Sequence, residues 1–272
     1  MLSFIKNELE QFNIDLISCL KISECELRKP YLLECEGIYE GSVVIFAVPY
    51  LSYDAWGERN VSSYAVSRDY HYFFKSLFDK VIGNLKSQFP EYKFAGFTDH
   101  SPINEIAAAS RAGLGVIGEN HMLITEKHSS YIFIGEIITD AKLPPFAKEI
   151  QSCIGCGLCR KMCPVGLDTA KCLSALTQKK GVLTNEEEST IKSSNCAWGC
   201  DICQQVCPHT KKALENGTLF TKINFFNTDL IPILTSSHID KMNDNEFQMR
   251  AYSWRGKDTI KRNLEILEGK EK

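Results

Sequence analysis

The chain has 272 residues, a hydrophobic fraction of 44% and a charged fraction of 24%. These values describe a globular protein with one large domain, or with a main domain and appendages. The net charge of −3 excludes a global attraction to nucleic acid or to an anionic membrane. A polyanionic partner would therefore need a local basic patch.

The sequence contains no recognisable targeting or membrane segment. The first residues, MLSFIKNELEQFNIDL, predict an amphipathic helix and lack the cationic start and long apolar run of a signal peptide. No apolar run reaches the roughly 18 residues that a membrane helix needs. We therefore expect a cytoplasmic protein with no membrane partner. In a reducing compartment, its 12 cysteines favour metal binding over disulfides.

Residues 1–150 predict a domain of mixed α/β class. The β-branched run GSVVIFAVPY (41–50) predicts a buried strand, and DYHYFFKSLFDKVIGNLK (69–86) predicts a helix with one apolar face. KFAGFTD (93–99) and YIFIGEIITD (131–140) predict two further strands. Alternation of strands and helices in this order favours a sheet covered by helices.

A second helix is predicted within SPINEIAAASRAGLG, which follows the strand at 93–99. Ser101 is the expected N-cap, because its hydroxyl can accept a backbone N–H. Pro102 suits the first helical position and Gly113 suits the stop. The strand before this helix ends on Asp99, so that carboxyl is expected at a strand end.

Residues 151–215 form a cysteine module. The run CIGCGLCRKMCP has the spacing C-x2-C-x2-C-x3-C followed by proline. Three closely spaced thiolates can surround one iron–sulfur cubane, and the cysteine before proline ligates the other cluster of the pair. Zinc sites usually use separated CxxC pairs, so the spacing favours iron–sulfur clusters over zinc. The four cysteines are Cys153, Cys156, Cys159 and Cys163.

A second motif, GCDICQQVCP, reproduces the last three positions of this pattern with Cys200, Cys203 and Cys207. Its first ligand should stand at position 197, which is Ala197. Cys196 is one residue out of phase, and Cys172 would have to reach in from a longer loop, so spacing leaves both open. The ligand-exchange rule predicts one cluster on Cys153, Cys156, Cys159 and Cys207, and a second on Cys163, Cys200, Cys203 and either Cys172 or Cys196.

The cysteine module and the segments before it resemble the epoxyqueuosine reductase family, whose members perform the last step in making queuosine in tRNA. The likeness runs from about residue 40 to 215, through SYAVSRDYH (63–71), FTDHSPINEIAAASRAGLGVIGENHMLI (97–124), YIFIGEIITD (131–140) and KCLSALTQKKG…GCDICQQVCP (171–208). It implies an N-terminal α/β cobalamin-binding catalytic domain followed by a ferredoxin-like dicluster [4Fe-4S] module.

The resemblance also implies the ligands and cofactors. The family's lone cysteine, with a serine two positions later, matches Cys172 and Ser174 in KCLSALT, which leaves Cys196 as the spare thiol. Members carry two [4Fe-4S] clusters and cobalamin, with the nearer cluster feeding electrons to cobalt. An external electron donor such as a flavodoxin or ferredoxin system would then be needed.

The implied reaction is a two-electron reduction of an epoxide to an alkene. Its proton donor maps onto Asp99, whose pKa should rise if the cofactor desolvates it. From the residues alone, an aspartate that caps a turn is the commoner use. The cofactor contacts implied by the resemblance are Tyr70, His71, Asn120 and Ser174.

Residues 216–272 predict a short, polar C-terminal tail with a basic patch. Full-length family members continue into helical repeats that help to grip tRNA, so the chain resembles a short form without them. Binding of tRNA would then depend on Lys179, Lys180, Lys211, Lys212, Arg250, Arg255, Lys257, Lys261 and Arg262, with Tyr252 and Trp254 stacking on bases. An ordinary solvated helix face is the other interpretation of this patch.

The main functional prediction is a monomeric reductase that converts epoxyqueuosine to queuosine in tRNA. A related cobalamin and [4Fe-4S] reductase that acts on a small molecule is the first alternative, and it is favoured by the missing repeats. A dicluster electron-transfer protein without a substrate of its own is the second. Bound corrinoid would exclude the electron carrier, and tRNA binding would separate the two enzymes.

Overall fold

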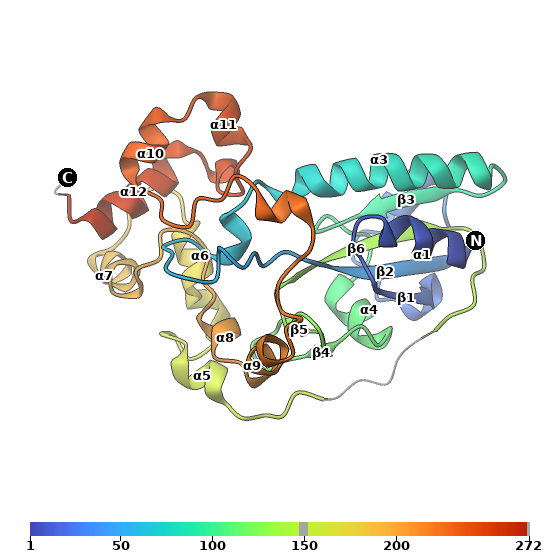
Figure 1. Cartoon of the computed structure of the whole chain (residues 1–272), viewed down its shortest axis with the longest axis horizontal. Coiled ribbons are helices and arrows are strands. Elements are labelled where there is room, and N and C mark those ends of the chain that lie inside the picture. Colours follow the sequence, from blue (N-terminus) through green and yellow to red (C-terminus); the bar gives the residue numbers. More distant parts are fainter. Residues whose placement is uncertain (147–151, 271–272) are drawn as a thin grey trace.

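The computed structural model describes residues 1–146 and 152–270, and a four-stranded sheet forms its centre (Figure 1). The strand order is β1-β2-β6-β3, and every neighbouring pair is antiparallel. The strands are β1 (Leu16–Lys21), β2 (Ser42–Pro49), β3 (Phe94–Phe97) and β6 (Ile132–Thr139). A two-stranded ribbon, β4 (Val116–Ile117) and β5 (Leu123–Ile124), precedes β6.

Helices cover both faces of the sheet because its two central strands are apolar on both sides. Val44 and Phe46 point into one core, with helices α1 (Leu2–Glu10) and α3 (Tyr70–Gln88). Val43 and Ile45 alternate with them and point into a second core, with α2 (Tyr31–Glu36) and α4 (Glu105–Arg111). Figure 1 shows α3 and α4 on opposite sides of the sheet. The predicted mixed α/β class is confirmed.

Two details of the predicted elements are wrong. The first helix ends at Glu10, and an unpredicted edge strand, β1, follows it. Helix α4 is capped by Asn104, whose side chain accepts the N–H of Ala107 at 3.3 Å. Ser101 lies before the helix begins, where its hydroxyl accepts the backbone N–H of Ile103 at 3.1 Å and donates to the buried Glu136 at 2.7 Å. The predicted stop is right, since Gly113 has a φ of 76° directly after the helix.

Short helices dominate the second half of the chain. The cysteine module contains α5 (Leu158–Met162), α6 (Leu173–Thr177), α7 (Asn185–Ser194), α8 (Ile202–Gln205) and α9 (Pro208–Glu215), and the last segment contains α10 (Ser236–Lys241), α11 (Asp244–Gln248) and α12 (Lys257–Glu268). Single 3-10 turns occur at η1 (Ile22–Glu24), η2 (Ser63–Ala65), η3 (Thr169–Lys171), η4 (Asn224–Asn227) and η5 (Ser253–Arg255). Nowhere in the described ranges is a helix both long and apolar enough to cross a bilayer.

The segment predicted as a polar tail folds back onto the rest of the molecule. Its first part adds Phe226 to the core beneath α3. Its last part builds a further core in which Tyr252, Ile260 and Leu264 surround Trp198 of the cysteine module. All four of these side chains are at most 1% exposed. The few apolar residues of the last segment are therefore enough to fold it onto the molecule, because they pack against apolar residues of other segments.

Gly135 makes the centre of the sheet sensitive to one added methyl group. A Cβ at this position of β6 would lie 2.5 Å from the ring of Phe46 and 2.6 Å from that of Phe74. Gly135→Ala should therefore lower the free energy of unfolding by about 1–3 kcal/mol, the usual effect of overpacking. The matched control is Gly83→Ala on the exposed side of α3, where no atom lies within 4 Å. That change should stabilise the protein by ~0.5–1 kcal/mol. Urea denaturation of both variants measures the difference, and equal effects would contradict this packing account.

Candidate active site and cluster-binding module

Asp99 lies where β3 ends, in the loop that leads into α4. Its backbone adopts a left-handed conformation with a φ of 57°, which aspartate tolerates better than most residues. Its carboxyl accepts a hydrogen bond from the hydroxyl of Tyr70. The predicted alternative, a capping aspartate, does not describe α4, because Asn104 occupies that position.

The beginning of α3 supplies the other groups around Asp99. Asp69 caps this helix by accepting the backbone N–H of His71 at 3.0 Å, and it also contacts Nδ1 of His71 at 2.8 Å. The other ring nitrogen, Nε2, lies 3.6 Å from the Asp99 carboxyl. The Tyr70 ring is held in place by stacking on Phe133 at 4.0 Å. Tyr70 and His71 thus flank Asp99.

The electrostatic environment of Asp99 favours the protonated carboxyl. Partial burial raises the pKa of Asp99, and the nearby charge of Asp69 raises it further. The side chain nevertheless keeps 52% of its surface exposed, so a ligand can reach it. An accessible carboxyl that keeps its proton to higher pH is suited to act as a general acid.

Two further carboxyls behind Asp99 were missed by the sequence analysis. Burial raises the pKa of Glu105 to about 7, with a further increase from Asp99. Glu136, fully buried on β6, has a pKa raised to about 8 by burial, while its hydrogen bond from Ser101 opposes the shift. The signal for Glu136 is present in YIFIGEIITD, where one acidic residue interrupts an apolar strand.

The thiols of the first group line a pocket and do not converge on the position of a single metal ion. A pocket is lined by the thiols Cys153, Cys156, Cys159 and Cys207, together with Asn120 and His209. In the part of the chain that the structure describes, no three His, Cys, Asp or Glu side chains converge closely enough for a single ion. Burial raises the pKa of the Cys207 thiol, and Cys153 and Cys156 are among the neighbours that add to the shift.

The second group lies around α8. Burial raises the pKa of Cys203 to about 12, and the neighbouring thiols that raise it further are Cys200, Cys163 and Cys172. Cys200 has a pKa raised to about 11 by burial, with Cys172 and Cys163 also contributing. Cys172 is therefore an electrostatic neighbour of both Cys200 and Cys203. Segments that are distant in the chain meet here, and α5 packs against α8.

Cys196 has a different environment. Its sulfur donates to the backbone carbonyls of Gly199 at 3.1 Å and Trp198 at 3.5 Å. Burial raises the pKa of this thiol to about 12, and the neighbouring Cys200 raises it further. Cys196 thus points at the backbone of its own turn.

Two further predicted cofactor contacts lie beside the thiols. Asn120 is buried, lines the first thiol pocket and contributes a side-chain hydrogen bond at Cys203. Ser174 is the second residue of α6, two residues after Cys172, and its hydroxyl accepts Nε2–H of Gln178 at 3.3 Å. Asn120 is therefore close to both thiol groups, whereas Ser174 is close only to the second.

A buried ion pair fastens the second cysteine motif to the α/β domain. Asp201, between Cys200 and Cys203, accepts Nη2 of Arg59 at 3.0 Å, and both side chains are at most 6% exposed. The same carboxylate accepts hydrogen bonds from Ser62 and from the backbone N–H and hydroxyl of Ser63. Each carboxylate oxygen therefore has partners, as a buried charge requires.

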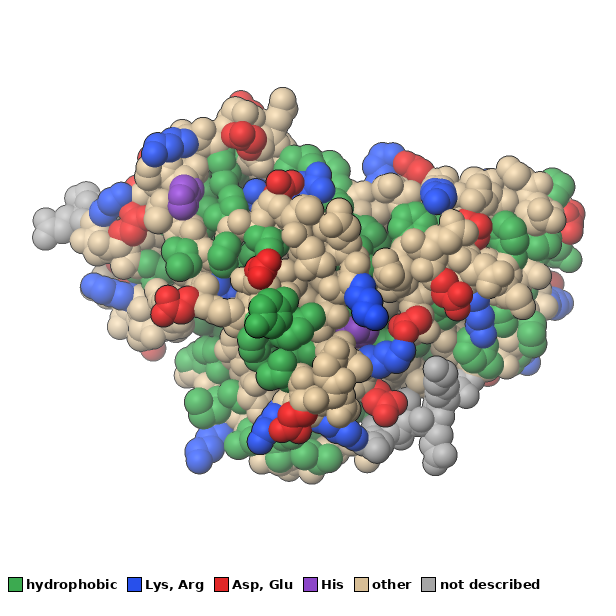
Figure 2. All heavy atoms as spheres, viewed as in Figure 1, with side chains coloured by type: hydrophobic (Ala, Val, Ile, Leu, Met, Phe, Trp, Pro, Cys, Tyr) green, Lys and Arg blue, Asp and Glu red, His purple; other side chains and the backbone are tan. Residues whose placement is uncertain are grey.

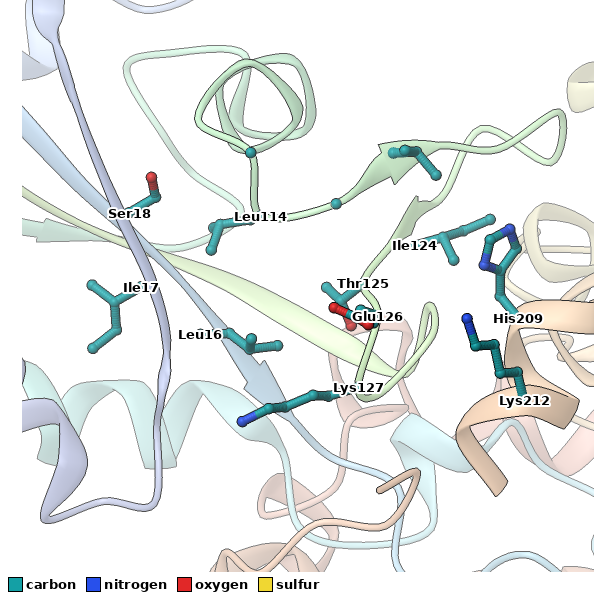
Figure 3. Close-up of a pocket in the computed structure, with 13 residues that line it drawn as sticks. Leu16, Ile17, Ser18, Leu114, Ile124, Thr125, Glu126, Lys127, His209 and Lys212 are labelled. Atoms are coloured by element: carbon teal, nitrogen blue, oxygen red, sulfur yellow. The ribbon is translucent and has the colours of Figure 1, made fainter. Parts of the chain in front are cut away.

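A second cavity adjoins the first thiol pocket and shares Ile124 and His209 with it (Figure 3). It has a volume of about 250 Å³, apolar walls from Leu16, Ile17 and Leu114, and a basic edge at Lys212. The Nε2 atom of His209 is buried without a hydrogen-bond partner in the structure. This nitrogen is available to a ligand.

The predicted nucleic-acid contacts are only partly available. Tyr252 is 1% exposed, so the prediction that it stacks on bases is wrong, whereas Trp254 is 58% exposed. Ion pairs engage Lys179, Lys211, Lys257 and Lys261 with Glu187, Glu215, Asp244 and Asp240. Figure 2 shows acidic and basic side chains interspersed on this face. The basic patch is weaker than its sequence suggests.

Comparison with known proteins identifies the class first. Residues 152–211 match the family model of a 4Fe-4S dicluster domain. The chain is therefore an iron–sulfur protein in which a dicluster domain is joined to an antiparallel sheet covered by helices.

The relatives that it matches are epoxyqueuosine reductases. The enzyme from Bacillus cereus is 33% identical over 210 residues, which cover 72% of this chain and 53% of that protein. The structure of the Streptococcus thermophilus enzyme aligns with a TM-score of 0.78 at 22% identity, covering 98% of this chain and 80% of that one. An epoxyqueuosine reductase solved with an epoxyqueuosine-modified tRNA stem loop aligns with a TM-score of 0.75 at 24% identity, covering 98% of this chain and 81% of that one.

The resemblance predicted from the sequence is thereby confirmed. The likeness in fold extends through the whole cysteine module and into the last segment, which the sequence resemblance did not reach. The chain spans about half the length of the curated relatives that it matches.

Glu136 should make stability depend on pH. Its pKa in the folded protein, about 8, exceeds the ordinary value of 4.5, so the folded state binds more protons between these values. The free energy of unfolding should therefore fall as pH rises from 4.5 through 8. Glu136→Gln keeps an acceptor for Ser101 and removes the ionisation, so the variant should lose less stability across this range. Urea denaturation at pH 5 and pH 8, with the exposed Glu91→Gln as control, tests this. An unchanged pH dependence in Glu136→Gln would refute it.

Proposed function

We propose that this chain is a cobalamin- and iron–sulfur-dependent oxidoreductase that reduces epoxyqueuosine to queuosine in tRNA. The observation that carries the proposal is the combination of an accessible, proton-retaining Asp99 with a dicluster domain in one fold. Reduction of an epoxide to an alkene needs two electrons and two protons, because the oxygen leaves as water. The Asp99 site can donate a proton to that oxygen, and the dicluster domain can supply the electrons one at a time.

In this proposal Asp99 is the general acid. The Tyr70 hydroxyl, which bonds to the Asp99 carboxyl, orients it toward the substrate. His71 is a group that can return a proton to Asp99, since its Nε2 lies 3.6 Å away and Asp69 fixes its ring. The raised pKa of Asp99 supports this role, because a protonated carboxyl is needed before the oxygen departs.

The proposed cluster ligands are four cysteines each. One [4Fe-4S] cluster is bound by Cys153, Cys156, Cys159 and Cys207, and the other by Cys163, Cys172, Cys200 and Cys203. The common pocket of the first set and the mutual electrostatic influence within the second support this division. The hydrogen bonds of Cys196 to its own turn support its exclusion.

Cobalamin is the second proposed cofactor, and when bound it would deliver electrons to the epoxide carbon. The residues that would hold it are Tyr70, His71, Asn120 and Ser174. The unpartnered Nε2 of His209 fits a polar ligand in the adjoining cavity. That cavity is smaller than the roughly 300–1,000 Å³ of a usual ligand pocket, so it would take only a part of the cofactor.

The proposed substrate is tRNA, which a relative binds as an epoxyqueuosine-modified stem loop. Lys180 and Lys212 have no ion-pair partner among the residues described, and Trp254 is exposed for stacking. With so few free cations, binding should be weak and should decline with salt.

In this proposal, residues 1–150 form the catalytic domain, residues 151–215 form the dicluster domain, and residues 216–272 form a C-terminal segment that adds basic groups. We further propose a cytoplasmic monomer with a flavodoxin- or ferredoxin-type electron donor.

The ligand assignment predicts different results for the two candidate thiols. Cys172→Ser should lose roughly half of about eight irons per chain, because one cluster loses a ligand. Cys196→Ser should retain almost all of them, and it is the matched control because its sulfur is also partly buried. Iron and sulfide analysis of anaerobically purified protein, with the absorption spectrum, measures the difference. If Cys196→Ser loses the iron instead, the assignment is wrong.

The substrate and the general acid are tested together. Wild-type protein, with cobalamin, a reductant and epoxyqueuosine-containing tRNA at low salt, should form the alkene product. Asp99→Asn keeps the shape of the side chain and should reduce turnover at least ~10²-fold while iron content and corrinoid binding persist. Near-normal turnover would exclude Asp99 as the acid. If the wild type binds corrinoid but forms no product from tRNA, the small-molecule reductase becomes the better proposal.

A further inference from the structure

Helix α5 carries ligands of both proposed clusters. It contains Cys159 of the first set and ends at Cys163 of the second. It packs against α8, and none of its residues is buried. Figure 1 shows it at the lower edge of the view, well away from the beginning of α3, where Tyr70 meets Asp99. A partner bound to α5 would therefore approach the cluster ligands from a side other than that of Asp99.

Apolar side chains are exposed on α5 and on the turn before it. Leu158 and Met162 are four residues apart, so they lie on the same face of the helix. Their exposed fractions are 39% and 51%, and Ile154, between two thiols, is 63% exposed. Apolar side chains that gather on a surface mark a contact site, and methionine adapts to partners of different shape.

Two cations stand beside these apolar side chains. Arg160 and Lys161 are exposed on α5. Neither has an ion-pair partner among the residues that the structure describes, although Arg160 donates from Nη1 to the carbonyl of Gly166 at 3.3 Å. Figure 2 shows apolar and basic side chains together at the lower left, where α5 lies in Figure 1. The name α5 face is used below for Ile154, Leu158, Arg160, Lys161 and Met162.

The segment that bears the α5 face is positive, although the whole chain has a net charge of −3. Residues 152–172 contain three cations, Arg160, Lys161 and Lys171, and one acidic residue, Asp168. Glu119 also approaches this segment, from the side of the first thiol pocket. The excess of positive charge beside the thiols favours a partner with carboxylates on its contact surface, because complementary charges guide two proteins together.

We propose that the α5 face is the docking surface for an acidic one-electron carrier protein. In each encounter the carrier loses one electron and the dicluster domain gains it, so two encounters supply the electron pair for the epoxide. Arg160 and Lys161 attract carboxylates of the carrier, while Leu158 and Met162 exclude water from the contact. The use of these electrons on epoxyqueuosine rests on the proposed function, whereas the docking surface depends only on the dicluster domain.

The residue types of the α5 face favour a protein over tRNA. Residues 152–172 contain no Phe, Tyr or Trp, the side chains on which unpaired bases stack. Methionine and arginine, in contrast, are enriched in the contact surfaces of proteins. Complexes for electron transfer are transient and bury less than about 1,200 Å² in total, so a small face is sufficient.

The electron transfer itself tests the charge of the α5 face. Reduced flavodoxin, an acidic carrier, is mixed anaerobically with the cluster-loaded full-length protein, and the flavin absorbance is followed by stopped flow. The wild-type rate should fall at least ~10-fold between ionic strengths of about 0.01 M and 1 M, because salt screens the attraction. Lys161→Glu should be slower than wild type by a similar factor at low salt and should approach it at high salt. Lys86→Glu, the same charge change on exposed α3, is the matched control and should keep the wild-type rate.

Three further measurements separate docking from damage to the clusters. Iron content and the rate of reduction by dithionite, which needs no docking surface, should be equal in all variants. Met162→Gln keeps the length of the side chain and should slow the reaction with flavodoxin at high salt as well. Carbodiimide joins a lysine amine to a carboxylate in contact with it, so it should join flavodoxin to Lys161 and not to Lys86 in the wild-type complex.

Several results would overturn the docking surface. They are a wild-type rate that does not depend on salt, equal rates for Lys161→Glu and Lys86→Glu, and cross-links that avoid α5. If Lys161→Glu weakens tRNA binding and leaves the reaction with flavodoxin unchanged, the α5 face binds nucleic acid and the proposal is wrong. If flavodoxin reduces the protein as expected but no alkene forms from tRNA, the proposed function is refuted and the docking surface stands.

Discussion

The buried ion pair of Asp201 and Arg59 is the interaction on which the arrangement of the two halves depends. Asp201 stands between two thiols of the second cysteine motif, and its partners in the α/β domain are Arg59, Ser62 and Ser63. Loss of one member of such a pair typically costs about 3–5 kcal/mol, because the other charge stays buried and unpaired. The parallel bridge between Val61 and Trp198 continues the same contact. The thiols are thereby fixed relative to the sheet that carries Asp99.

The antiparallel sheet in turn determines where the carboxyls lie. β6 pairs with both β2 and β3, so Glu136 sits beside the strand that ends in the Asp99 loop. Because side chains alternate across a strand, Glu136 shares the face of α4, which carries Glu105. Three carboxyls thus extend from the core to an accessible surface. The charge of Asp99 raises the pKa of Glu105, and the charge of Glu105 raises that of Glu136.

The sequence predicted the strands and the helix that have a strong apolar periodicity. The strands at 41–50 and 131–140 and the helix at 69–86 were found because apolar spacing depends only on local geometry. The cap at Asn104 was missed, since Ser101 and Asn104 are both good caps by residue type and Ser101 accepts the N–H of Ile103 in the turn before the helix. The last segment was taken for a tail because Tyr252 and Leu264 gain their burial from Trp198, far away in the chain.

The sequence by itself determined the cysteine spacing, and with it the dicluster domain, because ligands within a few residues of one another need no tertiary contact to converge. It also determined the resemblance to epoxyqueuosine reductases, which is carried by ordered motifs. Only the tertiary structure decided which thiols are neighbours across the module, and that Glu105 and Glu136 stand behind Asp99. These contacts join segments that are distant in the chain, so local sequence patterns do not reveal them. The pKa of a carboxyl or thiol depends on its burial and on nearby charges, which exist only in the folded protein.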